Sequence, residues 1–382
     1  MEIWRKARLG EVCHFKYGEM PKKNDLTTEG YPVFSGYRQV GFSSRYHYTE
    51  PEIIVVARGV GGTGDIKMTP PKCFLTNLSI AIVPSTPDIF KPFLFYRLSA
   101  TTLWSLRTGS AQAQITIERL KDFEIAFPPL PVQQRIAGIL SAYDELIENS
   151  QRRIKILEQM ARNLYREWFV QFRFPNHAKT PMVDSPLGKI PKGWEVKTVG
   201  DIAEEMRRAV PKGKLDAPQS YVGLEHIPRR TLALDNWEAV SELGSNKLLF
   251  KKGEVLFGKI RPYFHKVSVA PFDGVCSADT IVLRAYRKEH DALMVAVVTS
   301  DDFVALATAT SNGSKMPRAN WGVLENHQIA LPDNKLLGQF SELFSNTIAE
   351  QQTLIFRIQN LRKTRDLLLP RLLSGQIHVG EN

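Results

Sequence analysis

Two segments of the chain place their apolar residues at the spacing of a long α-helix. Residues 132–169 read VQQRIAGILSAYDELIENSQRRIKILEQMARNLYREWF, and residues 335–373 read KLLGQFSELFSNTIAEQQTLIFRIQNLRKTRDLLLPRLL. In both segments the apolar positions step alternately by four and three, which is the heptad pattern of a coiled-coil seam. Prolines stand just before the first segment and Pro175 follows it, as expected at helix boundaries.

The two predicted helices need something to pack against. At 1.5 Å per residue, roughly 37 residues make a rod about 55 Å long. A small domain cannot bury such a rod, so each helix is expected to pack along the other. The first seam has one polar member, Ser150, and the second seam is more polar. The expected pairing residues are Ile136, Leu140, Tyr143, Ile147, Ile154, Leu157 and Leu164 in the first helix and Phe340, Phe344, Leu354, Ile358, Leu361 and Leu368 in the second.

Short motifs recur along the chain. FEIAFPP at Phe123 aligns with HQIALPD at His327, an offset of 204 that also brings two Gly-Ser pairs into register. Aligning IIVVARGV with EVLFGKIR sets Arg58 against Lys259. Self-similarity over the whole length predicts a duplicated unit, and the drifting offsets indicate insertions in loops.

The repeats and the local composition predict an α+β fold with two tandem globular domains, each followed by a long helix. Runs such as EIIVVA and DTIVLRA, separated by Gly, Pro and Asn turns, indicate short strands. The predicted parts are a first domain at 1–130, a long helix at 131–174, a Pro- and Gly-rich linker at 175–193, a second domain at 194–333, and a second long helix with a tail at 334–382.

Charge and cysteine content indicate what kind of partner the protein binds and in which compartment it works. Among the 382 residues, 50 Lys and Arg stand against 40 Asp and Glu, and this net charge of +10 favours a polyanionic partner such as nucleic acid. Cys13, Cys73 and Cys276 lie far apart, which argues against a disulfide framework or a structural zinc site. The N-terminus has no apolar signal region and no apolar stretch is long enough to span a membrane, so a cytoplasmic protein is expected.

A glycine cluster follows an apolar run at residues 53–64, IIVVARGVGGTG. Its Gly-x-Gly-x-x-Gly spacing is that of a dinucleotide-binding loop, in which glycines admit a pyrophosphate at a helix N-terminus. The next residues, DIKMTPPKC, include Pro70 and Pro71, which forbid that helix. No acidic residue stands at a strand end about 20 residues on. The context therefore argues against a nucleotide site.

A second catalytic interpretation uses Glu52, Asp65 and Lys67. Two carboxylates near a lysine could hold Mg²⁺ and activate water, as in nucleases. The glycine loop interrupts the strand that should carry the second carboxylate and the lysine, so surface charge is the favoured explanation. A Mg-dependent nuclease acting alone stays the alternative function, and a structural coiled-coil scaffold is a second rival. Walker A, GxSxG and HExxH signatures are absent from the sequence.

Basic and aromatic loops are better candidates for a binding surface. DNA contacts need Arg and Lys for phosphates, and Arg, Asn, Gln or Ser for base edges. Such loops occur at matching places in both predicted domains. In the first half the candidates are Tyr37, Arg38, Arg45, Arg58, Lys67, Arg107, Ser110, Gln112 and Gln114. In the second half they are Arg207, Arg208, Lys259, Arg261, Tyr263, Asn312, Ser314, Lys315 and Arg318.

These motifs resemble the DNA specificity subunits of type I restriction-modification systems. The resemblance rests on FEIAFPPLPVQQRIAGILSAYDELIE after a Gly-Ser loop, on the LYREWF helix end and on RDLLLPRLLSGQI, and it covers essentially the whole chain. It implies two target recognition domains that each read one half of a split DNA sequence. It also implies that the two helices pack as an antiparallel coiled coil that holds these domains apart.

The resemblance further implies a chain with no active site, cofactor or metal of its own. Its implied partners are double-stranded DNA and two methyltransferase subunits, which methylate adenine with S-adenosylmethionine. The assembly can also recruit restriction subunits that use ATP and Mg²⁺. No base-contacting residue carries over by motif, so the loop residues above rest on charge and repeat position.

Overall fold

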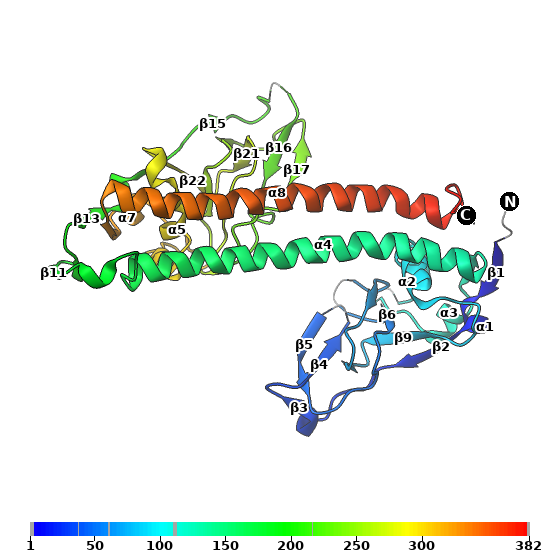
Figure 1. Cartoon of the computed structure of the whole chain (residues 1–382). Helices are drawn as coiled ribbons and strands as arrows, with labels where there is room; N and C mark the ends of the chain where they lie inside the picture. The colour runs from blue at the N-terminus through cyan, green and yellow to red at the C-terminus, as the bar shows by residue number, and fades with distance from the viewer. Residues whose placement is uncertain (1–3, 37, 60–61, 110–112, 216, 380–382) are drawn as a thin grey trace. The chain divides into compact units, whose positions relative to one another are not determined.

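The computed structural model describes residues 4–36, 38–59, 62–109, 113–215 and 217–379. The chain forms two compact units. Unit 1 consists of two segments, the residues up to Glu145 and the residues from Arg362 onward. Unit 2 is Leu146–Leu361. Both units mix helices and strands, which confirms the α+β class (Figure 1). Both long helices contribute to both units, so a division of the chain at the helix ends stays a prediction.

Unit 1 is built on two four-stranded sheets and one strand pair. The first sheet has the order β2 (Cys13–Tyr17), β9 (Ser79–Pro84), β6 (Ile53–Val56) and β7 (Ile66–Met68). The second has the order β3 (Leu26–Thr27), β5 (Arg38–Ser43), β4 (Tyr31–Ser35) and β8 (Phe74–Leu75). β1 (Arg5–Arg8) pairs with β10 (Glu124–Phe127), and the short helices are α1 (Leu9–Val12), α2 (Lys91–Ser99) and α3 (Ile117–Lys121). β6 is buried along its whole length, as its unbroken apolar run predicts.

Unit 2 repeats the strand order of the first sheet of unit 1. Its four-stranded sheet runs β14 (Ala203–Glu205), β22 (Thr280–Ala285), β19 (Val255–Gly258) and β20 (Val267–Val269). A five-stranded sheet runs β15 (Ala209–Val210), β18 (Lys247–Phe250), β21 (Gly274–Ser277), β16 (Gln219–Val222) and β17 (Glu238–Val240). β13 (Glu195–Thr198) pairs with β23 (Gln328–Leu331), and the helices are α5 (Asp291–Val298), α6 (Asp301–Ala309) and α7 (Trp321–Leu324). β19, like β6, is the buried central strand.

The segment predicted to be a linker has structure of its own. β11 (Met182–Ser185) and β12 (Gly188–Pro191) form an antiparallel hairpin within 175–193. The turn between them closes through the Ser185 hydroxyl, which donates to the Gly188 carbonyl at 2.7 Å, and Gly188 adopts a φ of +87°. A left-handed residue of this kind is what a tight hairpin turn needs, so the glycine supports the turn.

The long helices are α4 (Leu130–Tyr165) and α8 (Asn334–Leu373). α4 ends before the predicted boundary, because the chain passes through a π-helical turn at Arg166–Val170. An ion pair of 2.6 Å between Arg173 and Glu167 closes the segment that follows. α8 begins where the Asp333 carboxylate accepts a hydrogen bond from the Leu336 N–H at 2.8 Å, which caps the helix N-terminus.

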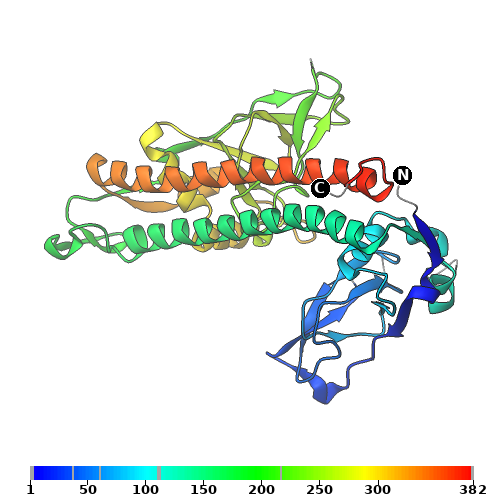
Figure 2. The same ribbon diagram turned by 45° about the vertical axis from the view of Figure 1, so that its right-hand side comes forward.

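The two helices pack together within each unit. In unit 2, Ile154 and Ile358 share one apolar cluster, and the rings of Trp168 and Phe340 lie 5.9 Å apart. In that unit α4 and α8 run side by side in opposite directions (Figures 1 and 2). In unit 1, Leu140 and Leu372 belong to the same core.

Burial follows the predicted seam. The buried members are Ile136, Leu140, Ile147, Ile154, Phe340, Phe344, Leu354 and Ile358. The half-buried members are Tyr143, Leu157, Leu164, Leu361 and Leu368. The polar member Ser150 is buried as well, and its hydroxyl donates to the Leu146 carbonyl at 2.7 Å.

No single helix of the described ranges is both long and apolar enough to cross a membrane. One bent pair, Lys288–Val298 with Asp301–Ala309, reaches that level by length and composition only. Residues Ala292–Val298 of this pair are buried in the core of unit 2.

One histidine of unit 2, His265, is buried against a backbone carbonyl. The His265 side chain is 3% exposed, and its Nε2 lies 3.0 Å from the Thr299 carbonyl oxygen. His265 itself has a φ of +51°, in the left-handed region. Burial lowers the pKa of its imidazole, because the charged form would lose its hydration.

We expect Ile358→Ala to destabilise unit 2 by about 2–5 kcal/mol, because it leaves a cavity at a fully buried position of the seam. Ile156 is a matched control on α4 because its side chain is 61% exposed, and Ile156→Ala should change the free energy of unfolding by no more than about 0.5 kcal/mol. Chemical denaturation of the full chain measures both values. Equal losses for the two variants would contradict the packing described for the seam.

A second prediction concerns pH. The pKa of His265 is lower in the folded chain than in the unfolded chain, so the stability that neutral His265 supports is complete above about pH 6.5 and is lost as the pH falls below it. His265→Asn keeps a residue that tolerates positive φ but cannot titrate. The difference in unfolding free energy between wild type and variant should therefore shrink between about pH 7 and pH 5. A difference that does not depend on pH would show that His265 does not titrate on unfolding.

Candidate nucleic-acid interface

Two loops distant in sequence join into one edge in unit 1. Thr108 and Gln114 exchange backbone hydrogen bonds of 2.9 Å. Gln114 also forms an antiparallel bridge with Arg58, which follows the central strand β6. Nε of Arg107 donates to the Thr63 carbonyl at 2.7 Å, so this segment is tied to the loop that follows β6 as well. We call this combined edge the unit 1 loop cluster: residues 57–59, 62–65, 107–109 and 113–115.

The glycine loop serves this packing. Gly64 has a φ of +97°, and a Cβ there would lie 3.3 Å from Cδ1 of Ile115 and 3.4 Å from Cδ1 of Trp104. Both the backbone conformation and the close approach favour glycine. The loop leads into strand β7, so it lacks the helix N-terminus that a dinucleotide cradle requires.

Unit 2 has the same arrangement. Asn312 and Arg318 exchange backbone hydrogen bonds of 3.1 and 2.9 Å, and Arg318 forms an antiparallel bridge with Ile260. The Ala319 N–H donates to the Lys259 carbonyl at 2.9 Å. We call residues 259–261 and 312–319 the unit 2 loop cluster.

The bridges correct one sequence alignment. Gln114 and Arg318 differ by the offset of 204, and their bridge partners are Arg58 and Ile260. Arg58 therefore stands level with Ile260, and the alignment that set it against Lys259 is one residue wrong. The slip arose because the two apolar runs match almost equally well in either register.

Several predicted DNA-contacting side chains are exposed. In unit 1 these are Arg38, Arg58, Lys67 and Gln114, and in unit 2 they are Tyr263, Asn312, Ser314, Lys315 and Arg318. Lys259 and Arg261 are half-buried in the unit 2 loop cluster, where Nη2 of Arg261 donates to the Lys315 carbonyl at 3.4 Å. Tyr37, Ser110 and Gln112 lie outside the described residues. DNA contact by any of these residues stays a prediction.

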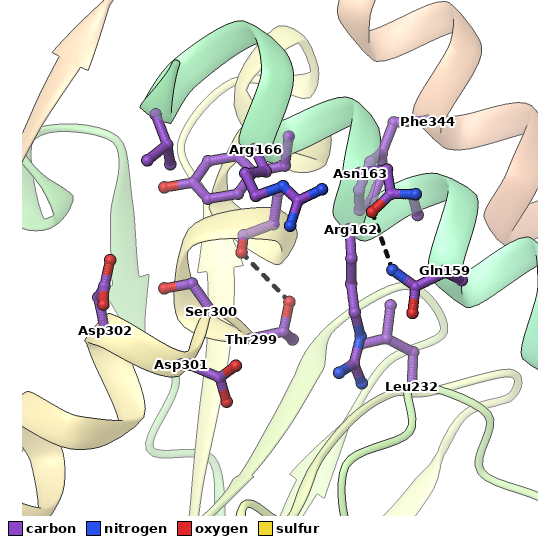
Figure 3. A pocket seen from close by; sticks show the side chains of 14 residues that line it. Gln159, Arg162, Asn163, Arg166, Leu232, Thr299, Ser300, Asp301, Asp302 and Phe344 are labelled. Carbon is purple, nitrogen blue, oxygen red and sulfur yellow. Dashed lines mark hydrogen bonds between the residues drawn. The ribbon is translucent and has the colours of Figure 1, made fainter.

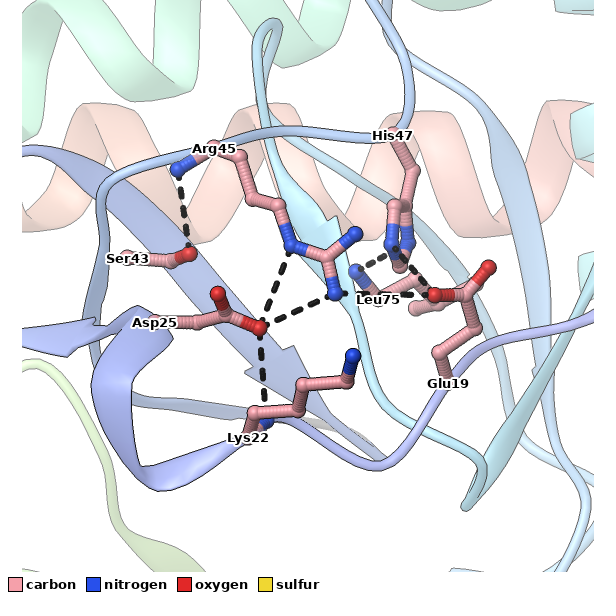
Figure 4. A network of polar contacts seen from close by, with 7 residues as sticks. All are labelled: Glu19, Lys22, Asp25, Ser43, Arg45, His47 and Leu75. Atoms are coloured by element: carbon pink, nitrogen blue, oxygen red, sulfur yellow. Dashed lines mark hydrogen bonds and ion pairs between the residues drawn. The ribbon is translucent and has the colours of Figure 1, made fainter.

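Arg45 is held in a polar network of unit 1 (Figure 4). Its guanidinium lies 2.9 Å from Asp25 and 3.7 Å from Glu19, and it sits 5.2 Å from the ring centre of Phe74. The hydrogen bond from Arg45 holds the pKa of the Asp25 carboxyl below its usual value. These contacts fix the guanidinium against the second sheet, so a DNA contact by Arg45 would compete with them.

Three other candidate arginines are also engaged. Arg107 lies 4.6 Å over the ring of Trp104, in addition to its bond to the Thr63 carbonyl. Arg207 pairs with Glu205 at 2.6 Å, and Arg208 pairs with the buried Glu254. Of these, Arg207 has the most exposed side chain, at 72%.

Trp104, Arg229 and Arg230 have exposed side chains that the sequence interpretation did not select. Trp104 is 60% exposed beside the unit 1 loop cluster. Arg229 places its guanidinium 3.9 Å from the ring centre of Phe264 in unit 2. The adjacent pair of arginines was visible in the sequence, but nothing there linked it to the distant loops.

The geometry argues against the nuclease alternative. Glu52 is buried and pairs with Lys91 at 2.9 Å. The registers place Glu52 opposite Thr69 and Asp65 opposite Val56, four residues further along β6. At about 3.3 Å per residue this separates the two carboxylates by about 13 Å along the strand. Within the part of the chain that the structure describes, no group of three His, Cys, Asp or Glu side chains could hold a metal ion.

The chain is similar to known proteins along most of its length. Residues 1–159 match the family model described as the type I restriction modification DNA specificity domain. The type I restriction enzyme MjaIX specificity subunit of Methanocaldococcus jannaschii is 25% identical, over 80% of this chain and 73% of that protein. The EcoDI specificity subunit of Escherichia coli is 22% identical, over 98% of this chain and 88% of that protein.

A solved structure shares the fold. The crystal structure of a type I restriction-modification system S subunit from M. genitalium matches with a TM-score of 0.66 and 16% identity, over 97% of this chain and 96% of that chain. Residues 1–159 therefore match the type I restriction modification DNA specificity domain, and the chain along most of its length is similar to specificity subunits of type I restriction-modification systems.

Proposed function

We propose that this chain recognises a bipartite DNA sequence, each unit reading one half. The observation that carries the proposal is the recurrence of one loop cluster in both units, beside a buried central strand of the same sheet order. Each cluster exposes long polar side chains on a rigid base of backbone hydrogen bonds. Rigid presentation of this kind suits base readout, because it lowers the entropy lost on binding.

The side chains in the two clusters suit different bases. Arg58 and Gln114 of unit 1 and Asn312 and Arg318 of unit 2 are exposed. Arg can bind guanine with two hydrogen bonds, and Gln or Asn can bind adenine in the same way. Different side chains on one backbone plan would therefore give two different half-sequences.

The chain acts as a non-catalytic subunit, as the named specificity subunits among its relatives support. We propose that two methyltransferase subunits supply adenine methylation with S-adenosylmethionine. Restriction subunits using ATP and Mg²⁺ would join the same assembly. The residues described in unit 1 favour no independent nuclease centre, since Glu52 is neutralised by Lys91.

We further propose that α4 and α8 form one antiparallel coiled coil that separates tandem recognition domains. The opposed helix directions in unit 2 and the shared core in unit 1 support this. Outside the seam, Ile156 and Met160 of α4 are 61% and 57% exposed, and Leu343 of α8 is 51% exposed. Apolar side chains exposed on a helix are suited to a protein partner, here the methyltransferase subunits.

Mapping of methylated adenines tests the proposed function. In cells that express the chain with a methyltransferase partner, methylation should fall at two short sequences separated by a fixed gap. Arg58→Ala should relax or weaken the first half-sequence only, by about 1–3 kcal/mol if the arginine contacts a base. Arg119→Ala, an exposed arginine of α3 outside the cluster, is the matched control.

Two outcomes would contradict this proposal. Loss confined to the second half-sequence would show that Arg58 does not serve the first. Plasmid cleavage by the purified chain with Mg²⁺ alone would favour the nuclease alternative.

Deleting one heptad from each helix in register tests the spacer role. Seven residues shorten a helix by about 10.5 Å, which equals about three base pairs of DNA. The gap should therefore shorten by about three base pairs, and both half-sequences should stay unchanged. A heptad deleted from α4 only is the control, because it breaks the seam and should abolish methylation. Altered half-sequences in the in-register variant would show that the helices do not set the gap.

A further inference from the structure

A row of cations follows one face of α4 in unit 2. Arg152, Lys155 and Arg162 of α4 and Arg166 at the start of the π-helical turn, with Gln159 between them, step by three and four residues and so lie on one face of the helical segment. Lys155 and Arg162 lie one residue, about 100° of helical turn, after the buried Ile154 and Ala161, and the other members lie two residues, about 200°, from the nearest seam residue. The row therefore lies outside the seam. Arg152, Lys155 and Arg166 are exposed, and Arg162 is half-buried.

The row is continuous with the loops of unit 2. The Arg162 guanidinium donates to the Arg230 carbonyl, and the Arg230 N–H donates to the His265 carbonyl at 2.8 Å. Phe264 lies in the turn before His265, and the Arg229 guanidinium lies 3.9 Å from the centre of the Phe264 ring. The same turn begins at Arg261, which contacts Lys315 of the unit 2 loop cluster. We call the cations Arg152, Lys155, Arg162, Arg166, Arg229 and Arg230 the α4 track.

Acidic groups neutralise only part of the track. Glu148 pairs with Arg152 at 3.0 Å on the exposed surface, and Asp301 pairs with Arg230 at 3.0 Å. Among the described residues, Lys155 and Arg166 form no ion pair within 4 Å. Arg162 and Arg166 also border a pocket of about 330 Å³ beside Ser300 and Asp301 (Figure 3). Lys155 and Arg166 of the row are therefore available to bind an external anion.

The helix pair does not require these cations. The offset of 204 that aligns Ile154 with Ile358 sets the four cationic positions of α4 against other residue types in α8. These counterparts are Phe356, Gln359, Asp366 and Pro370. A packing requirement shared by both helices would have kept similar residues in both. The track is specific to α4 and to the unit that it borders.

Resting on the proposed function, we infer that the α4 track binds the phosphate backbone of DNA that continues from the second half-site. The 15 residues from Arg152 to Arg166 are separated by 14 steps of 1.5 Å, about 21 Å, which matches about six phosphates along one strand. Lysine and arginine side chains that contact phosphates, and not base edges, give no sequence preference. The track adds affinity and orients the duplex, and it leaves the recognised bases to the loop clusters.

The salt dependence of DNA binding tests the track. The full chain with Arg152→Gln, Lys155→Gln and Arg166→Gln is compared with wild type on a fluorescent duplex of random sequence. Each lost phosphate contact should lower the slope of log K against log salt by about 0.9, so the slope should fall by about two to three units. Lys179→Gln, Lys189→Gln and Lys192→Gln form the matched control, because they remove the same charge from exposed positions of the hairpin segment.

The result also separates the track from the proposed function. The triple variant should methylate the same bases as wild type, with weaker binding to all duplexes. Arg152→Lys with Arg166→Lys should keep the wild-type slope, because the charges are retained. A wild-type slope in the triple variant would overturn the inference that the track binds DNA phosphates. A triple variant that loses only its assembly with the methyltransferase would overturn it as well, because the row would then bind an acidic protein surface. A wild type that directs no methylation at a split sequence overturns the proposed function instead.

Discussion

Burial of apolar side chains between α4 and α8 is the interaction on which the rest of the structure depends. A helix of 36 or 40 residues with this many polar positions gains little from propensity alone, and its stability in water comes from packing. In unit 2 the helices also enter the core of the globular part, where Phe340 and Phe344 lie in one cluster with strands β19 and β22. The helices are therefore part of the core of each unit.

Buried polar groups fix these positions. Glu158 of α4 is 6% exposed, and its Oε1 accepts hydrogen bonds from the N–H groups of Leu232 and Ala233 at 2.6 and 3.1 Å. In unit 1, Asp144 of α4 accepts from the Tyr96 hydroxyl at 2.6 Å and pairs with Arg365 of α8 at 2.6 Å. Because an unpaired buried polar group costs about 1–3 kcal/mol, the bonds to Glu158 select one placement of residues 232–233 against α4 in unit 2.

The same logic applies at the start of α4. Gln133 is fully buried, and its amide accepts from the Phe90 N–H at 2.9 Å and donates to the carbonyls of Asp88 and Pro128 at 2.7 and 2.8 Å. A carboxylate at this position would have no proton to give to either carbonyl. The helix therefore begins at a point that the loop before α2 defines.

The two long helices could be predicted from the sequence, because heptad spacing depends only on local order. Ile147 and Ile358, which this spacing places in the seam, are buried, and their pairing along one coiled coil stays a prediction. Features that depend on distant contacts were missed or misplaced. The early end of α4 follows from a π-helical turn, and the engagement of Arg45 follows from Asp25 and Glu19, which no local pattern connects to it. For the candidate site, DNA contact by the loops stays a prediction, and the contacts of each side chain could not be predicted from local sequence.

The two loop clusters explain why exposed residues there resist prediction by motif. The bridges that shape each cluster are made by backbone atoms, so they hold Arg58 with Gln114 in unit 1 and Ile260 with Arg318 in unit 2. Only backbone geometry and a few close approaches, such as that at Gly64, restrict the sequence. Side chains that point outward can change without disturbing the edge that presents them. A fold of this kind can change the bases it reads while the helices and sheets that position the loops stay the same.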